Sequence, residues 1–395
     1  MNYIDPKFQA RKTQIVEVLE TVCASLELSA SQSGLAKERY EGVGACLAQS
    51  ENPVLRNIAV YLQGSTALRT TVKPIGVNEF DVDLVAHVPD LDVQVSPAAL
   101  KKAIGDCLRG NGNYASLLEE LPRCWRLNYA NEFHMDITPS IPNPGCEFGG
   151  ELVPDKTLRE WKASNPKAYK SLFEQRAKLV PVFQLHKGIA EGRRASVEPY
   201  PEAGGFKGIL RRTVQIAKRH RDIMFIDDPE VAPLSVIITT LTSRSYEWCV
   251  TNYRYDNELD LCFDVIRHLP DTIETHYVEG RKQWSIWNET TKGENFAEKW
   301  NRRADRAEAF FKWYARFCSD LEELQAVRGL DRLDGALKGL FGAWPANAAI
   351  NSLTERVSAA RRAGELRVAP AIGLGVGMMP ASTFVKANTF YGSTR

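Results

Sequence analysis

Residues 58–88 read IAVYLQGSTALRTTVKPIGVNEFDVDLVAHV, and this stretch decides the fold class of the chain. Its first apolar run, residues 58–62, predicts a short strand that stops at a Gly-Ser pair. Apolar and polar residues alternate over residues 80–88, which is the pattern of a half-buried strand. Because successive side chains of a strand point to opposite faces, we expect Asp81 and Asp83 to share one face while their apolar neighbours point into the core.

The Gly-Ser pair before the two aspartates suits the chemistry of nucleotides. Glycine lets the backbone approach a phosphate closely, and a helix that opens after Ser65 would aim its N–H groups at that anion. Ser65 precedes Asp81 by 16 residues. Phosphoryl and nucleotidyl transfer require neutralised charge, which two Mg²⁺ ions roughly 3.5–4 Å apart provide when carboxylates hold them. Taken alone, Asp81 and Asp83 could equally belong to a solvent-facing strand edge.

A third carboxylate, Asp136, lies within the apolar run of residues 133–137. An unpaired charge in such a strand is costly, and a nearby metal ion would remove that cost. The alternative is a salt bridge to an arginine such as Arg126. His134 shares the face of Asp136, but a single histidine is more often a hydrogen-bonded structural residue, so we leave it out. The candidate metal ligands are therefore Asp81, Asp83 and Asp136.

The composition is that of an ordinary globular protein. The 395 residues, 44% of them hydrophobic and 25% charged, suffice for one large domain or two closely packed lobes. A formal net charge of +1 gives no general attraction to nucleic acid polymers or anionic membranes, so we expect a small anionic substrate. The eight cysteines lack metal-finger spacing, no signal peptide is recognisable, and no apolar run is long enough to cross a membrane. We therefore expect a cytoplasmic location.

The organisation along the chain predicts a mixed α/β first half and a helical second half. Two strands are expected at residues 124–129 and 133–137, and a junction rich in proline and glycine at residues 193–208. Helices of the first half are expected at residues 5–49, 157–162 and 166–178. Helices of the second half are expected at residues 209–224, 231–246, 259–269 and 296–324.

These motifs, in this order, resemble the nucleotidyltransferase superfamily with the DNA polymerase β-like fold. The chain more closely resembles the bacterial cGAS/DncV-like nucleotidyltransferases of CBASS anti-phage systems. The stretches that carry this resemblance are LQGSTALRTTVKP, EFDVDLVAHVP, RCWRLNYANEFHMDITPSIP, LVPDKTLREWKASNPKAY, LRRTVQIAKRHRD, PLSVIITTLTSRSY and NFAEKW. They run from about Tyr61 to Trp300, and their order and spacing make the resemblance specific.

The resemblance implies an α+β fold. It consists of a polymerase β-like nucleotidyltransferase palm, a mixed sheet with flanking helices, packed against a helical C-terminal lobe, with the active site in the cleft between them. Residues 1–195 would then hold the N-terminal helices and the catalytic palm. Residues 196–395 would form the mainly α-helical lobe.

The resemblance also implies roles for individual residues. The metal-binding and catalytic triad matches Asp81, Asp83 and Asp136, of which the last is also the natural base for the attacking ribose hydroxyl. The loop that holds the triphosphate matches Gln63, Gly64 and Ser65. The family's helix lysine, which reaches the donor phosphates, matches Lys218, and a serine on the next helix matches Ser235.

The sequence also carries expectations for the arginines around Lys218 and for Ser140. Without the resemblance, the arginines around Lys218 are typical of a solvated helix face. Ser140 stands where relatives often have a small apolar residue, and we expect little consequence from it.

The activity implied is synthesis of a cyclic oligonucleotide second messenger from ATP and/or GTP, with release of pyrophosphate. We expect a purine cyclic dinucleotide of the cGAMP type and two Mg²⁺ ions per active site, with Mn²⁺ as a substitute. The expected partners are a downstream anti-phage effector that senses the product and a CBASS regulatory protein. No membrane and no stable nucleic-acid polymer are expected as partners. The alternatives are a cyclic trinucleotide synthase, a transferase acting on tRNA, RNA ends or an antibiotic, and an inactive nucleotide-binding scaffold.

Overall fold

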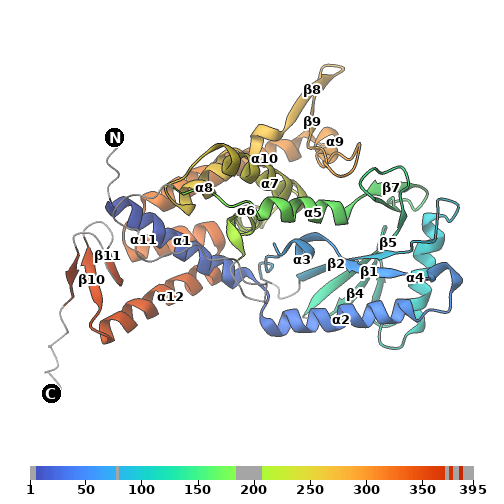
Figure 1. Cartoon of the computed structure of the whole chain (residues 1–395), viewed down its shortest axis with the longest axis horizontal. Helices are drawn as coiled ribbons and strands as arrows, with labels where there is room; N and C mark the ends of the chain where they lie inside the picture. The colour runs from blue at the N-terminus through green and yellow to red at the C-terminus, as the bar shows by residue number, and fades with distance from the viewer. Residues whose placement is uncertain are drawn as a thin grey trace.

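The first half of the chain forms one mixed sheet that lies beside a helical half (Figure 1). The structure, a computed structural model, describes residues 6–76, 80–130, 132–183, 207–369, 373–376 and 382–385. The strands of the sheet are β1 (Ala59–Leu62), β2 (Phe80–His87), β3 (Leu118–Glu120), β4 (Trp125–Tyr129), β5 (Phe133–Pro142), β6 (Glu151–Pro154) and β7 (Trp161–Ser164). Their order is β1-β2-β5-β4-β3, with β6 on β5 and β7 on β6. Only the β2–β5 pair among them is parallel.

One face of this sheet is covered by two helices. The apolar side chains of α2 (Ala30–Ala48) and α4 (Pro97–Gly110) share a core with the inward-facing residues of β2, β4 and β5. Val82 and Leu84 belong to this core and are 1% and 0% exposed. The expected alternation along β2 is confirmed, and it places Asp81 and Asp83 on the opposite face of the sheet.

The helical half has its own apolar core. Its helices are α6 (Gly208–Met224), α7 (Ser235–Asn252), α8 (Glu258–Arg267), α9 (Glu298–Arg302), α10 (Ala304–Ala326), α11 (Leu330–Phe341) and α12 (Ala343–Arg362). The N-terminal helix α1 (Pro6–Leu26) packs in this core too, through Ile15, Val18 and Val22. Helices α1 and α12, which are far apart in sequence, therefore lie in the same half (Figure 1).

Short elements complete the fold. Between the two halves lie α3 (Gly64–Leu68) and α5 (Pro166–Ala177), which contribute Leu68 and Phe173 to a small core shared with α6, α7 and α8. The remaining elements are the 3₁₀ turns η1 (Pro53–Leu55) and η2 (Leu269–Thr272), the hairpin β8 (Glu274–Val278) and β9 (Arg281–Ser285), and the sheet of β10 (Leu366–Ala369), β11 (Gly373–Val376) and β12 (Thr383–Phe384). The hairpin projects from the helical half (Figure 1).

The helix expected at residues 157–162 is wrong. The segment is a turn followed by β7, because the Asp155 side chain accepts hydrogen bonds from the backbone N–H groups of Arg159 and Glu160. Leu158 has a left-handed φ of 57°, which a helix would not allow.

Two other boundaries differ from expectation or fall outside the described part. The helix expected at 296–324 is divided into α9 and α10 at Arg303. The junction expected at 193–208, and with it the division of the chain at 195/196, lies almost entirely within residues 184–206, outside the described residues. Among the helices that the structure describes, none is both long and apolar enough to span a bilayer.

Candidate active site

The register of three neighbouring strands brings the predicted carboxylates together. Asp83 of β2 lies directly opposite Asp136 of β5, and Asp136 lies directly opposite Arg126 of β4. Asp81 is two residues back along β2, so it projects from the same face one row away. Parallel pairing of β2 with β5 thus places all three predicted aspartates side by side on the face away from α2 and α4.

The electrostatics of the row reflect this crowding of like charges. Burial, followed by the charges of Asp136 and Asp81, raises the pKa of Asp83 to about 6. Burial also raises the pKa of Asp81, with Arg126 opposing that rise. A nearby cation would relieve the repulsion between carboxylates held this close together.

Within the structure, the cation closest to the cluster is Arg126. Its Nε donates to Asp136 Oδ1 at 2.6 Å and its Nη2 to Oδ2 at 2.8 Å, and Nη2 lies 3.7 Å from Asp81 Oδ1. The hydrogen bonds to Asp136 are the main reason why the pKa of Arg126 is raised. The salt bridge that the sequence left open as an alternative for Asp136 is therefore present.

The fit of the site to a metal ion rests on donor chemistry and on position. The three aspartates offer carboxylate oxygens, which Mg²⁺ prefers, on adjacent strands of a rigid sheet. In the described part of the chain, however, no three His, Cys, Asp or Glu side chains converge on one point as the ligands of an ion would. The residue types fit a metal, while the Asp136 carboxylate is turned to Arg126.

The Gly-Ser loop packs directly on the second aspartate. The backbone N–H of Gln63 donates to Asp83 O at 2.8 Å, and Gly64 follows with a left-handed φ of 64°. A Cβ at Gly64 would lie 2.4 Å from Asp83 Oδ2, so only glycine allows this approach. Ser65 is the next residue in α3, and its hydroxyl accepts from Thr71 Oγ1 at 3.4 Å.

Helix α6 holds the segment that follows this loop. Four of its side chains donate to main-chain carbonyls between residues 68 and 73. These bonds join Arg211 to Leu68 (3.1 Å), Gln215 to Thr71 (3.1 Å), Lys218 to Thr70 (3.3 Å) and Arg219 to Lys73 (3.1 Å). The segment that follows the loop is thus held from the helical half.

Lys218 is buried at this contact. It is 5% exposed, and its Nζ also donates to Thr70 Oγ1 at 3.1 Å. Burial, with a contribution from the charge of Arg221, lowers the pKa of Lys218 to about 8, although the charge of Asp83 opposes the shift. A lysine of the helical half and an aspartate of the sheet half therefore lie within electrostatic reach of each other.

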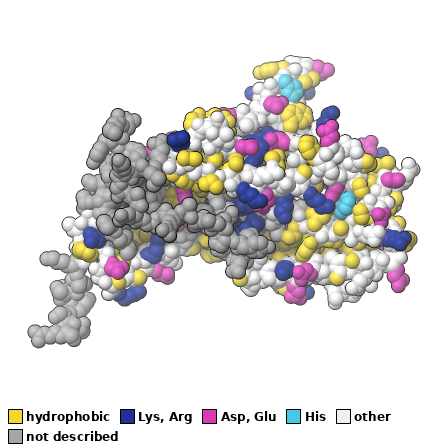
Figure 2. Space-filling model, in the orientation of Figure 1, with side chains coloured by type: hydrophobic (Ala, Val, Ile, Leu, Met, Phe, Trp, Pro, Cys, Tyr) yellow, Lys and Arg dark blue, Asp and Glu magenta, His cyan; other side chains and the backbone are white. Residues whose placement is uncertain are grey.

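The arginines around Lys218 do not form the solvated face that their sequence pattern suggests. Arg211 and Arg219 are 4% exposed, and Arg212 pairs with Glu20 of α1 and with Glu27, which directly follows α1. Helix α6 lies at the centre of the helical half, so its basic residues contact neighbouring elements on several sides. Figure 2 shows Lys and Arg side chains gathered near the middle of one face, where the two halves meet.

Ser235 lies at the start of α7 and is exposed. Its hydroxyl accepts from Arg221 Nη2 at 3.1 Å, and Arg221 also binds the carbonyl of Pro233. The charge of Arg221 also helps to lower the pKa of Lys218, so Arg221 lies near both Ser235 and that lysine.

Ser140 of β5 forms hydrogen bonds with two buried or half-buried side chains. It is fully buried, donates from Oγ to Glu151 Oε2 at 2.8 Å, and lies 3.0 Å from His87 Nδ1. Glu151, which is 3% exposed, also pairs with Lys167 of α5 at 3.4 Å. Because Ser140 satisfies a buried carboxylate next to α5, we now expect its removal to lower stability, in place of the little consequence that the sequence suggested.

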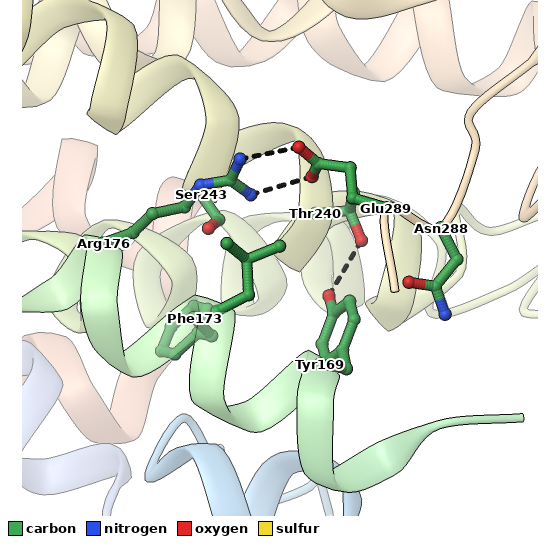
Figure 3. Close-up of a pocket in the computed structure, with 8 residues that line it drawn as sticks. Tyr169, Phe173, Arg176, Thr240, Ser243, Asn288 and Glu289 are labelled. Atoms are coloured by element: carbon green, nitrogen blue, oxygen red, sulfur yellow. Dashed lines mark hydrogen bonds and ion pairs between the residues drawn. The ribbon is translucent and has the colours of Figure 1, made fainter. Parts of the chain in front are cut away.

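A small pocket lies between α5, α7 and the loop after β9 (Figure 3). Arg176 bridges it through two bonds to Glu289, at 2.9 and 2.8 Å, and Tyr169 Oη lies 2.8 Å from Thr240 Oγ1. Its volume of about 10 Å³ is no larger than a single water requires. The pocket is a gap in a polar helix contact and is too small for a nucleotide.

Only some of the residues around the site could be identified from the sequence. Arg126 could be named because it faces Asp136 in an obvious strand pair. Thr70, which is fully buried and anchors Lys218, carries no such signal, because its role depends on a helix that lies 148 residues away in the chain.

Comparison with known proteins identifies relatives over most of the chain. Residues 14–176 match the family described as Second Messenger Oligonucleotide or Dinucleotide Synthetase domain. The c-di-GMP synthase of Roseivirga ehrenbergii is 28% identical over 390 residues, which cover 96% of this chain and 98% of that protein.

Two solved structures are similar in fold. CdnG of Bradyrhizobium diazoefficiens, in complex with GTP, matches with a TM-score of 0.65 at 19% identity, over 89% of this chain and 100% of CdnG. The CdnC:HORMA-deltaN complex of E. coli MS115-1 matches with a TM-score of 0.58 at 11% identity, over 84% of this chain and 97% of the matched chain. At these identities the likeness bears on the fold, and it confirms the predicted mixed sheet with flanking helices beside a helical C-terminal region.

Proposed function

Because the chain belongs to the cGAS/DncV-like nucleotidyltransferases, we propose that it joins purine nucleoside triphosphates into a cyclic dinucleotide and releases pyrophosphate. The observation that carries the proposal is the row of Asp81, Asp83 and Asp136 against which Gly64 is packed. The name of the Roseivirga relative, a c-di-GMP synthase, supports a cyclic dinucleotide as the product.

Asp81, Asp83 and Asp136 are proposed as ligands of two Mg²⁺ ions, with Mn²⁺ as a substitute. The family's enzymes are metal-dependent, and the donor chemistry of the three carboxylates suits these ions. When bound, the ions would neutralise the charge that develops on the phosphates during transfer.

In the proposed reaction, a ribose hydroxyl oxygen of one nucleotide attacks the α-phosphorus of another, and the bond to the β-phosphate breaks. Asp136 accepts the hydroxyl proton on a carboxylate oxygen, and pyrophosphate leaves. A second transfer within the linear product closes the ring. The protein contributes mainly by positioning and by stabilising charge.

The donor triphosphate is proposed to lie on Gln63, Gly64 and Ser65. Gly64 lets the loop backbone pack directly against Asp83, so the loop lies next to the proposed metal ligands. Lys218 and Ser235 are proposed as further contacts, since both lie close to Arg221 on the side of the helical half. The nucleotide would then occupy the predicted cleft between the two halves.

The test of the metal and catalytic roles is the loss of two separate carboxylates. We expect Asp81→Ala and Asp83→Ala to abolish turnover of labelled NTPs without unfolding the protein. Asp106→Ala is the matched control, because Asp106 is a carboxylate paired with Lys102 on the far helix α4. Substantial turnover by Asp81→Ala would show that the metal-site assignment is wrong.

The identity of the product is tested by omitting nucleotides in turn. A phosphatase-resistant product from GTP alone is expected for the c-di-GMP type, and a requirement for both ATP and GTP for the cGAMP type. Linear tails, which phosphatase degrades, would favour a transferase acting on RNA ends, and no product at all would favour an inactive scaffold. A larger resistant product would favour a cyclic trinucleotide. We further propose that the product activates an anti-phage effector, that a regulatory protein acts with the enzyme, and that the enzyme is cytoplasmic.

A further inference from the structure

Arg126 is fixed to Asp136 by the architecture of the sheet. The two residues are direct partners in the antiparallel β4–β5 register, so their side chains leave the same face next to each other. The guanidinium and the carboxylate form a bidentate pair, with one bond to each carboxylate oxygen. The side chains are 26% and 18% exposed, so water screens the pair only in part.

The pair occupies the carboxylate that completes the proposed metal site. Both oxygens of Asp136 accept hydrogen bonds from Arg126, and the same guanidinium lies 3.7 Å from Asp81. With its single positive charge, Arg126 reduces the charge of the three-aspartate cluster from −3 to −2.

A metal ion and Arg126 therefore compete for the same carboxylate. Both are cations, and each lowers the attraction that Asp136 has for the other. A nucleoside triphosphate changes this balance, because its phosphates bring additional negative charge and oxygen ligands to the ion.

We propose that Arg126 keeps the nucleotide-free site from holding Mg²⁺ or Mn²⁺ tightly, so that the metal enters together with the triphosphate. The inference rests on the proposed assignment of the three aspartates as metal ligands. Arg126 acts here as a positioning residue that controls Asp136, and it needs no contact with the substrate.

The experiment measures Mn²⁺ binding by electron paramagnetic resonance, with full-length protein and without nucleotide. Arg126→Gln should bind Mn²⁺ at least about tenfold more tightly than the wild type. A neighbouring arginine weakens the binding of a proton to a carboxylate by at least about this factor, and we expect the same of Mn²⁺ binding. Arg123→Gln is the matched control: it removes the same charge from the segment just before β4, where Arg123 Nε donates to Pro154 O at 2.9 Å. Its Mn²⁺ affinity should equal that of the wild type.

A second variant covers the case in which Arg126→Gln does not fold. Arg126→Lys retains the charge but cannot make the bidentate contact, so we expect Mn²⁺ affinity to rise by less than it does in Arg126→Gln. Unchanged affinity in the folded variants, or an equal rise in Arg123→Gln, would overturn the role of Arg126.

The two proposals fail in different ways. If wild-type protein binds Mn²⁺ with a nucleotide present, and loses it in Asp83→Ala, the metal site stands whatever Arg126 does. If no variant binds Mn²⁺ even with a nucleotide, the metal site itself is wrong, and the inference about Arg126 falls with it.

Discussion

Replacing Gly64 with alanine should damage the active site far more than it damages the fold. The new Cβ would lie 2.4 Å from Asp83 Oδ2, and an ordinary contact between carbon and oxygen is about 3.3 Å, so the carboxylate must retreat by roughly 1 Å. A displacement of about 1 Å in a catalytic constellation lowers the rate by roughly 100-fold. The left-handed φ of 64° should cost about 1–2 kcal/mol in unfolding free energy.

The control separates backbone strain from displacement of Asp83. Gly293 has a comparable φ of 80°, but a Cβ there would meet nothing within 4 Å. Gly293→Ala should therefore lose a similar unfolding free energy, measured by urea denaturation, and should keep its rate of NTP turnover. If both variants turned over NTPs equally well, the contact between Gly64 and Asp83 would have no bearing on the chemistry.

Two further predictions concern buried polar groups. In the free enzyme burial lowers the pKa of Lys218 to about 8, so the lysine loses its charge as the pH rises past that value, and kcat/KM for NTPs should fall. Lys218→Arg stays charged and should therefore remove this fall at alkaline pH. A wild-type profile of kcat/KM that is flat up to about pH 9.5 would contradict the role of Lys218. Ser140→Ala leaves the buried Glu151 without its hydroxyl donor and should lower the unfolding free energy by about 1–3 kcal/mol, whereas the exposed Ser319→Ala should leave it unchanged. Equal urea midpoints for these two serine variants would show that the hydroxyl is dispensable.

Local patterns predicted the catalytic strands well. The alternation of β2 was enough to place Asp81 and Asp83 on one face, since the period of a strand is a local property. The apolar context of Asp136 indicated that its charge needs a partner, but local sequence could not decide between a metal and Arg126. That choice depends on the register of β4 against β5.

Features that depend on distant contacts were predicted poorly. The surroundings of Lys218 looked solvated because a run of basic residues usually is, yet α6 is enclosed by α1, α7, α8 and α11. The helix expected at 157–162 failed because a single carboxylate, Asp155, caps a turn there. Helical periodicity carries no information about either effect.

The carbonyls of residues 68–73 receive their hydrogen bonds from residues that are 143 to 148 positions later in the chain. During synthesis the sheet and its aspartates can form first, since their contacts are nearer in sequence. The segment that follows the phosphate loop acquires these partners only after α6 has been made and has docked. A ribosome-bound chain that ends at α5 would therefore carry the acidic cluster without these bonds to residues 68–73, and the enzyme would become competent late in its own synthesis.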